Sequence, residues 1–267
     1  MQNIRRLLRS YGAIGIVVAL LLAVTFLPPD NSLQDVRNDG SISACVPATY
    51  PPLVTGDPDR PGIDIELLEA IAERLGVTLR INTNDAIGRD INPRNWRLNR
   101  AQCLLIAGGV VDSDQTRSFL ETSPAYARTG WAMVSPQPPG DLKALKIGIL
   151  TLVSGLDRIG LANLLRSSGT KYEIVRTPED LVAGITEHRF DAGITEALLA
   201  SQLASNNGWT AAWMPPELPR YNLVLGLWKG DLTLKRAVDA AFAALEADGT
   251  VAAILDRYVG TPLDPDR

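Results

Sequence analysis

The sequence from residue 232 onward reads Leu232-Thr-Leu-Lys-Arg-Ala-Val-Asp-Ala-Ala-Phe-Ala-Ala-Leu-Glu-Ala-Asp-Gly-Thr250 and continues Val251-Ala-Ala-Ile-Leu-Asp-Arg-Tyr-Val-Gly260. Apolar residues recur at helical spacing in the first part and predict one buried stripe made of Leu234, Val238, Ala241, Phe242 and Leu245. We expect Gly249 to end this helix in a left-handed conformation and Thr250 to accept amide hydrogen bonds at the start of the next helix. The pattern predicts a helix, a tight turn and a second helix.

The first part of the globular region has a different pattern. Ser41–Val46 alternates and predicts a strand, and Ile65–Leu75 places its apolar residues on one helical face. Gly76 ends that helix, and Val77–Ile81 alternates again. This order is a β-loop-α-β unit, the element of parallel sheets with right-handed crossovers.

The remainder of the chain continues the alternation of strands and helices. Further strands are predicted at Cys103–Gly109, Thr129–Val134, Lys146–Leu150, Tyr172–Arg176, Asp191–Thr195 and Leu223–Trp228. Helices are predicted at Gly155–Ser167, Pro178–His188 and Glu196–Ala204, with a short one within Asn92–Arg100. Periodicity alone is compatible with one larger α/β domain or with two smaller ones.

Residues 1–29 differ from the rest of the chain. Arg5, Arg6 and Arg9 precede an uncharged run from Ser10 to Leu27, which Pro28-Pro29 ends. This pattern predicts a secretory signal peptide or an uncleaved transmembrane helix that tethers the protein to the inner membrane. Either outcome places the body of the protein outside the cytoplasm. The chain has 26 basic and 30 acidic side chains, which argues against a nucleic-acid partner because such a partner requires a basic face.

The C-terminal pattern resembles the end of the extracytoplasmic solute-binding proteins of family 3, the polar amino-acid receptors of ABC importers. Other segments resemble landmarks of the same family across residues 41–260. These are Tyr50-Pro51-Pro52-Leu53, Pro61-Gly62-Ile63-Asp64-Ile65-Glu66-Leu67-Leu68, Leu105–Gly109, Thr122-Ser123-Pro124-Ala125-Tyr126 and Phe190-Asp191-Ala192.

The resemblance implies an α/β, two-lobed fold of the periplasmic binding protein-like II type. Each lobe is expected to hold a mixed, mostly parallel sheet flanked by helices, with a cleft between the lobes. We expect residues 41–128 and 222–260 to form lobe 1, and residues 132–218 to form lobe 2. Cys45 and Cys103 fall on strands that are neighbours in this fold, so a disulfide is expected, with two buried thiols as the alternative.

A receptor for a free amino acid needs a cation for the carboxylate, an anion for the ammonium group and apolar walls. The resemblance implies Arg117 as the cation, with Arg128 as a weaker substitute, and Glu196 as the anion. The complete set of predicted ligand-binding residues is Tyr50, Trp96, Gly109, Arg117, Ser154 and Glu196.

Structural roles are alternatives for most of these residues. Arg117 is also compatible with a solvated loop, and Glu196 and Ser154 with ordinary helix caps. Tyr50 and Trp96 are compatible with packing. One departure from the family affects the site directly, because Val110-Val111-Asp112 stands where hydroxyl side chains are usual. Two valines and a negative charge disfavour a carboxylate there, which implies a different binding mode or a solute other than an ordinary α-amino acid.

The predicted function is the periplasmic substrate-binding component of an ABC importer. It would bind an amino acid or an amine relative in the interlobe cleft, act as a monomer and deliver the solute to a membrane permease. No cofactor, metal site or catalytic motif is expected, and His188 is expected to be solvated. The alternative function is an accessory protein of a periplasmic quinoprotein dehydrogenase system, which the cysteine segments Ala44-Cys45-Val46 and Gln102-Cys103-Leu104 also resemble.

Overall fold

The computed structural model describes residues 15–19, 21, 29–87, 92–138, 140–151, 156–260 and 263. The chain forms two compact units, Met1–Asn31 and Ser32–Arg267. In the first unit, residues 15–19 and 21 are helical, and most of the predicted signal peptide or anchor lies outside the described residues. Within the described ranges, no helix combines the length and the apolar composition that crossing a membrane requires.

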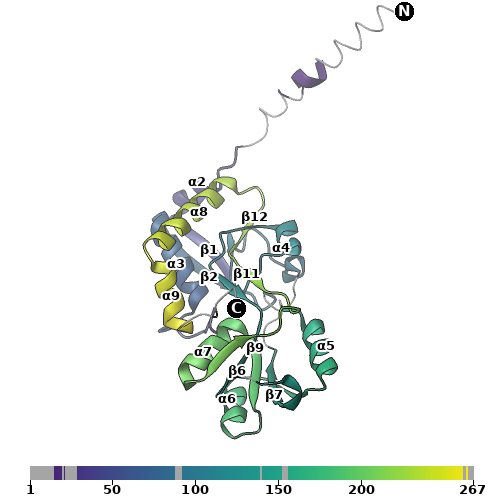
Figure 1. Cartoon of the computed structure of the whole chain (residues 1–267). Helices are drawn as coiled ribbons and strands as arrows, with labels where there is room; N and C mark the ends of the chain where they lie inside the picture. Colours follow the sequence, from purple (N-terminus) through teal and green to yellow (C-terminus); the bar gives the residue numbers. More distant parts are fainter. Residues whose placement is uncertain are drawn as a thin grey trace, which may run out of the picture. The chain divides into compact units, whose positions relative to one another are not determined.

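The second unit is built on two five-stranded sheets, which define its two lobes (Figure 1). Lobe 1 has the strand order β2-β1-β3-β12-β4, and lobe 2 has the order β10-β6-β9-β7-β8. The strands of lobe 1 are β1 (Ser41–Val46), β2 (Thr78–Thr83), β3 (Leu105–Ile106), β4 (Leu120–Thr122) and β12 (Gly226–Trp228). The strands of lobe 2 are β6 (Trp131–Ser135), β7 (Lys146–Leu150), β8 (Lys171–Val175), β9 (Ala192–Glu196) and β10 (Thr210–Trp213).

Both sheets are mixed in the same way. In lobe 1, β1 is parallel to β2 and β3, while β12 is antiparallel to β3 and β4. In lobe 2, β7 is parallel to β8 and β9, while β6 is antiparallel to β9 and β10. A third, two-stranded sheet pairs β5 (Ala127–Thr129) with β11 (Tyr221–Leu223), where the chain passes between the lobes.

Helices cover these sheets. The structure has α2 (Ser32–Asp39), α3 (Ile63–Leu75), α4 (Asp114–Phe119), α5 (Arg158–Ser168), α6 (Pro178–Thr186), α7 (Ala197–Asn207), α8 (Leu232–Ala247) and α9 (Thr250–Val259). Two short 3₁₀ helices are η1 (Pro93–Trp96) and η2 (Leu142–Ala144). Helices α3, α8 and α9 pack together on lobe 1, and α7 of lobe 2 also contacts α9 (Figure 1).

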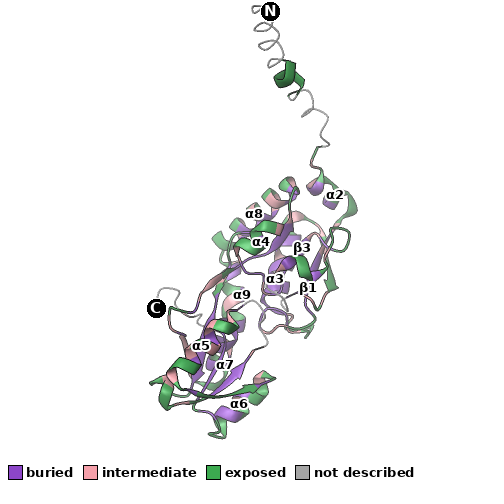
Figure 2. Cartoon of the chain, turned by 90° about the vertical axis from the view of Figure 1, so that its right-hand side faces the viewer, coloured by how far each residue is buried: buried purple, intermediate pink, exposed green. Residues whose placement is uncertain are grey.

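The predicted stripe of α8 is confirmed, because all five of its apolar residues are buried. They belong to one cluster with apolar residues of α3 and β1, and Figure 2 shows most of β1 and β3 as buried. The sheet of lobe 2 has an apolar cluster on each face. Trp131 and Met133 of β6 belong to one cluster, and the alternating residues Ala132 and Val134 belong to the other. Each sheet therefore organises its own core.

The turn between α8 and α9 confirms one expectation and corrects another. Gly249 has the expected left-handed conformation, with φ of 82°. It is itself the N-cap of α9, however, and Thr250 is the first helical residue. The backbone N–H and the hydroxyl of Thr250 both donate to the Asp248 carboxylate, at 3.0 and 2.6 Å. The expectation that Thr250 accepts amide hydrogen bonds is therefore wrong.

Other differences from the sequence predictions have local causes. The strand predicted at Cys103–Gly109 is only Leu105–Ile106, because Gly108 and Gly109 have φ values of 92° and 87° that no strand allows. Helices α2 and α4 and strand β10 are not among the predicted elements. They are short or largely polar, so their apolar pattern is weak.

The predicted disulfide is confirmed. Cys45 of β1 and Cys103 are bonded, with their Cα atoms 5.5 Å apart. The parallel pairing of Ala44 with Leu105 brings the two residues together. The bridge lies in an apolar cluster that also contains Trp96 and Ile87.

We predict that replacing both cysteines by alanine lowers the free energy of unfolding by roughly 4 kcal/mol, because the bridge closes a loop of 58 residues. Urea denaturation of the wild-type and variant proteins measures the difference. The matched control is wild-type protein denatured with a reductant, which should show the same loss. A loss below about 1 kcal/mol would contradict the loop-closure argument.

Candidate functional site

Asp64, at the start of α3, is fully buried and connects three segments of lobe 1. Its Oδ2 accepts hydrogen bonds from the backbone N–H groups of Gly108 and Gly109, at 2.6 and 3.3 Å. Its Oδ1 accepts the hydroxyl proton of Tyr126, at 2.5 Å. Burial raises the pKa of Asp64 from 3.8 to about 6, against the opposing effect of these three donors. The carboxylate is satisfied by hydrogen bonds but is not neutralised by an ion pair in the part of the chain that the structure describes.

Tyr50 follows β1 and lies between the lobes. It packs against the main apolar cluster of lobe 1 and also against one cluster of lobe 2. Its ring occupies the space beside Gly109, where an added Cβ would lie 2.8 Å from the ring. Burial raises the pKa of Tyr50 well above its ordinary value, and the negative charges of Glu196 and Asp64 raise it further. The ring is therefore an aromatic wall close to carboxylates from both lobes.

Glu196 ends β9 and caps α7 in lobe 2. One carboxylate oxygen accepts the hydroxyl proton of Thr129, and the other accepts the backbone N–H of Leu199 at 3.0 Å. The residue is 2 % exposed, and burial raises its pKa in spite of these donors. No lysine or arginine pairs with it among the residues described, so the buried charge has no counter-ion.

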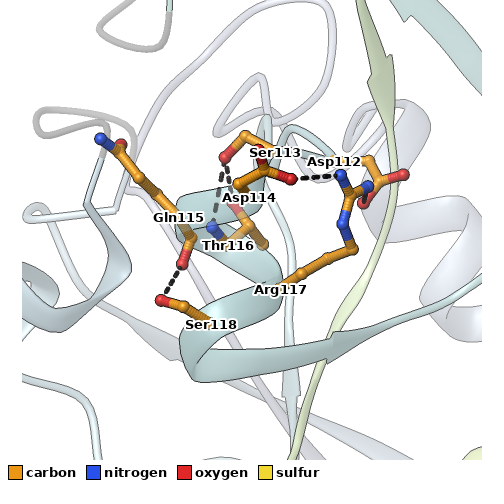
Figure 3. Close-up of polar contacts among 7 residues, drawn as sticks. All are labelled: Asp112, Ser113, Asp114, Gln115, Thr116, Arg117 and Ser118. Carbon is orange, nitrogen blue, oxygen red and sulfur yellow. Dashed lines mark hydrogen bonds and ion pairs between the residues drawn. The ribbon is translucent and has the colours of Figure 1, made fainter.

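Arg117 lies on α4, at the surface of lobe 1 (Figure 3). Its guanidinium pairs with Asp112 at 2.7 Å and with Asp114 at 2.8 Å, and 52 % of the side chain is exposed. A ligand carboxylate would have to replace both of these acidic partners. The predicted ligand role of Arg117 stays a prediction, and the structure adds this condition to it.

The departure at Val110-Val111-Asp112 has a structural explanation. Both valines are buried, and the segment forms backbone hydrogen bonds with residues of and next to β11. The N–H of Asp112 donates to the carbonyl oxygen of Asn222, and the N–H of Val224 donates to that of Val110. Apolar side chains suit this position because they lie in apolar clusters beside β11.

The remaining predicted residues are placed differently. Trp96 is 3 % exposed and packs in the disulfide cluster, so the structure does not bring it together with Tyr50 and Glu196. Ser154 lies outside the described residues. His188 is exposed, as expected. In the described ranges, no group of three or more His, Cys, Asp or Glu side chains is arranged to hold a metal ion.

A pocket of about 440 Å³ lies beside Tyr50, between a loop of lobe 1 and a segment of lobe 2. Its lining residues are Thr49, Tyr50, Pro51 and Thr55 from lobe 1, with Arg176, Thr177, Pro178, Glu179 and Leu199 from lobe 2. Arg176 and Glu179 are not among the ligand-binding residues predicted from the sequence. Their position directly after a parallel strand was a usable signal, since ligands in α/β proteins bind at the carboxyl ends of such strands.

A second pocket, of about 500 Å³, lies at the pairing of β5 with β11. Apolar side chains make up much of its wall, and Arg128 is its charged residue. It offers no anion for an ammonium group. The pocket beside Tyr50 has both charges and contacts both lobes, so we treat it as the candidate functional site.

The sequence matches the family model of bacterial extracellular solute-binding proteins, family 3, over residues 42–261. L-cystine-binding protein TcyJ of Escherichia coli (strain K12) is 24 % identical over 273 residues, which cover 93 % of this chain and 94 % of that protein. Membrane-bound lytic murein transglycosylase F of Cronobacter sakazakii is 23 % identical over 96 % of this chain. The match spans 51 % of that longer protein.

Solved structures show the same fold. An ancestral cationic amino acid solute-binding protein, AncCDT-1, aligns with a TM-score of 0.70 and 16 % identity. The alignment covers 85 % of this chain and 99 % of the ancestral protein. This likeness concerns the architecture, two lobes each with its own mixed sheet.

The raised pKa of Asp64 predicts how stability depends on pH. The folded protein keeps this proton up to about pH 6, whereas the unfolded chain loses it near pH 4. The free energy of unfolding should therefore fall as the pH rises from about 4 to about 6, by up to about 3 kcal/mol from this group. Asp64→Asn, which cannot ionise, should lack this decrease.

Urea denaturation at several pH values between 4 and 7 measures both proteins. The difference between their slopes isolates Asp64, because Glu196 titrates in wild type and variant alike. Equal slopes in the two proteins would show that the pKa of Asp64 is not raised in the folded protein.

Proposed function

The chain belongs to the bacterial extracellular solute-binding proteins of family 3, and we propose that its solute carries an amine group and binds between the two lobes, beside Tyr50 and Glu196. It acts as the periplasmic solute-binding component of an ABC importer. The observation that carries the proposal for the solute is the buried Glu196 carboxylate, which has no counter-ion among the described residues. Such a charge is unfavourable until a cation reaches it.

The surroundings of Glu196 favour the same class of solute. Asp64 adds a second buried negative charge within electrostatic reach of Tyr50. Aromatic faces attract cations, so the Tyr50 ring adds a third favourable contact for an ammonium or guanidinium group. Two of the matched proteins are named for cystine and for cationic amino acids, which contain such groups.

The remaining parts of the proposal follow from the family. Residues 41–128 and 222–260 form lobe 1, and residues 132–218 form lobe 2, a division that the membership of the two sheets supports. Residues 1–29 direct the protein to the periplasm or tether it to the inner membrane. The protein is a monomer without catalytic activity, and a permease recognises its closed form. The hinge is the β5–β11 pair, where closure bends two short strands.

A thermal-shift and calorimetric screen tests the proposed solute class. The panel contains L-arginine, L-lysine, L-cystine, L-glutamate and putrescine. A ligand at a hundred times its dissociation constant should stabilise the protein by about 2.7 kcal/mol, which raises Tm by several degrees. We expect the shift from the solutes with a free cationic group. No shift from any member of the panel would contradict the proposal.

We further predict that Glu196→Gln weakens binding of the active solute about tenfold or more, since an amide still accepts hydrogen bonds but carries no charge. The ligand-free variant should unfold at the same temperature as wild type or higher, because a buried charge is removed. The matched control is Glu246→Gln, which changes an exposed glutamate of α8. Unchanged affinity in Glu196→Gln would place the amine group elsewhere.

A further inference from the structure

The pocket beside Tyr50 contains two charged side chains that have no partner among the residues the structure describes. Arg176 follows β8, and Glu179 lies in the first turn of α6. Neither side chain forms a hydrogen bond or an ion pair with another residue in the described ranges. Both are exposed, so solvent and a small solute have access to them. The pocket thus offers a positive and a negative group at the same opening.

The strand arrangement brings Arg176 to the same edge of the sheet as Glu196. Strands β8, β7 and β9 are parallel, so their carboxyl ends lie together on the side where the pocket opens. Leu199 connects the two charged groups: its side of α7 lines the pocket, and its N–H donates to the Glu196 carboxylate. A solute in this pocket therefore meets the Arg176 guanidinium, and the buried Glu196 carboxylate lies within hydrogen-bond distance of the Leu199 backbone.

Other arginines near the cleft are already engaged. Arg117 pairs with two aspartates, and the segment before it is bonded to the hinge. Arg158, near Tyr50, donates to the carbonyl oxygen of Thr151 at 2.7 Å. Arg176 is the arginine of this pocket, and its guanidinium can grip a carboxylate with two parallel hydrogen bonds.

We propose that Arg176 binds the carboxylate of the solute, so that lobe 2 supplies both the cation and, through Glu196, the anion that recognise an α-amino acid. This inference rests on the proposed function. Lobe 1 then contributes the Tyr50 ring and the hydroxyl of Thr49. The negative charge of Glu179 beside Arg176 disfavours solutes with a second carboxylate, which makes the site selective against acidic amino acids.

The test compares amino acids with amines that lack only the carboxylate. The pairs are L-arginine with agmatine, L-lysine with cadaverine, and L-cystine with cystamine. Isothermal titration measures each pair on wild type, Arg176→Ala and Arg236→Ala. Arg236 is the matched control, since it is an exposed arginine of α8 without a partner among the described residues. Melting of the ligand-free proteins verifies that each variant folds.

We expect Arg176→Ala to weaken binding of the active amino acid about tenfold or more, and to change binding of its amine less than about twofold. Arg236→Ala should change neither. An equal loss for both members of a pair would overturn the inference, since Arg176 would then not contact the carboxylate. So would a selective loss in Arg117→Ala with none in Arg176→Ala.

The same data separate this inference from the function on which it rests. If wild type binds a pair and Arg176→Ala behaves like the control, the amine-binding receptor stands and the carboxylate site is elsewhere. If wild type binds no member of the three pairs, the proposed solute class fails, and the role of Arg176 fails with it.

Discussion

The buried carboxylate of Asp64 joins the start of α3 to the turn after β3 and to Tyr126 after β4. The positive φ angles of Gly108 and Gly109 direct two successive N–H groups toward it. Because Gly109 has no side chain, the Tyr50 ring fits against the same turn. The aromatic wall of the cleft therefore depends on a series of contacts that begins at Asp64. Loss of one of these contacts would displace the ring that touches both lobes.

The two buried carboxylates of the cleft region, Asp64 and Glu196, have different hydrogen-bond partners and therefore different roles. Asp64 has three hydrogen-bond donors within lobe 1, which fix a structure that does not need a ligand. Glu196 is held by a hydroxyl of the hinge strand β5 and by the first turn of α7. Thr129 thereby links the Glu196 carboxylate to the β5–β11 pair, which we propose as the hinge.

The sequence predicted those helices and strands in which apolar residues recur with a regular spacing. The stripe of α8 and the strand β1 are examples, since each is set by burial alone. The cap at Thr250 was mispredicted because Asp248 is the acceptor at this turn and receives hydrogen bonds from both the N–H and the hydroxyl of Thr250. Arg117 forms ion pairs with acidic residues five and three positions before it in the sequence. Only the geometry of α4 brings these residues into contact with its guanidinium. The pocket around Arg176 joins segments more than a hundred residues apart, and no local pattern reports such a contact.

If lobe 2 binds both charged groups of the solute, the solute can bind before the lobes close. A solute held by Glu196 and Arg176 binds the open form with most of its polar contacts already made, because both residues belong to one lobe. In the proposed closure the Tyr50 ring, which contacts apolar clusters of both lobes, covers the solute, and water leaves the ion pairs, which strengthens them. The affinity for the charged groups and the free energy of closure are thus supplied by different lobes. Substitutions at Tyr50 should therefore change closure more than initial binding, and substitutions at Arg176 should do the reverse.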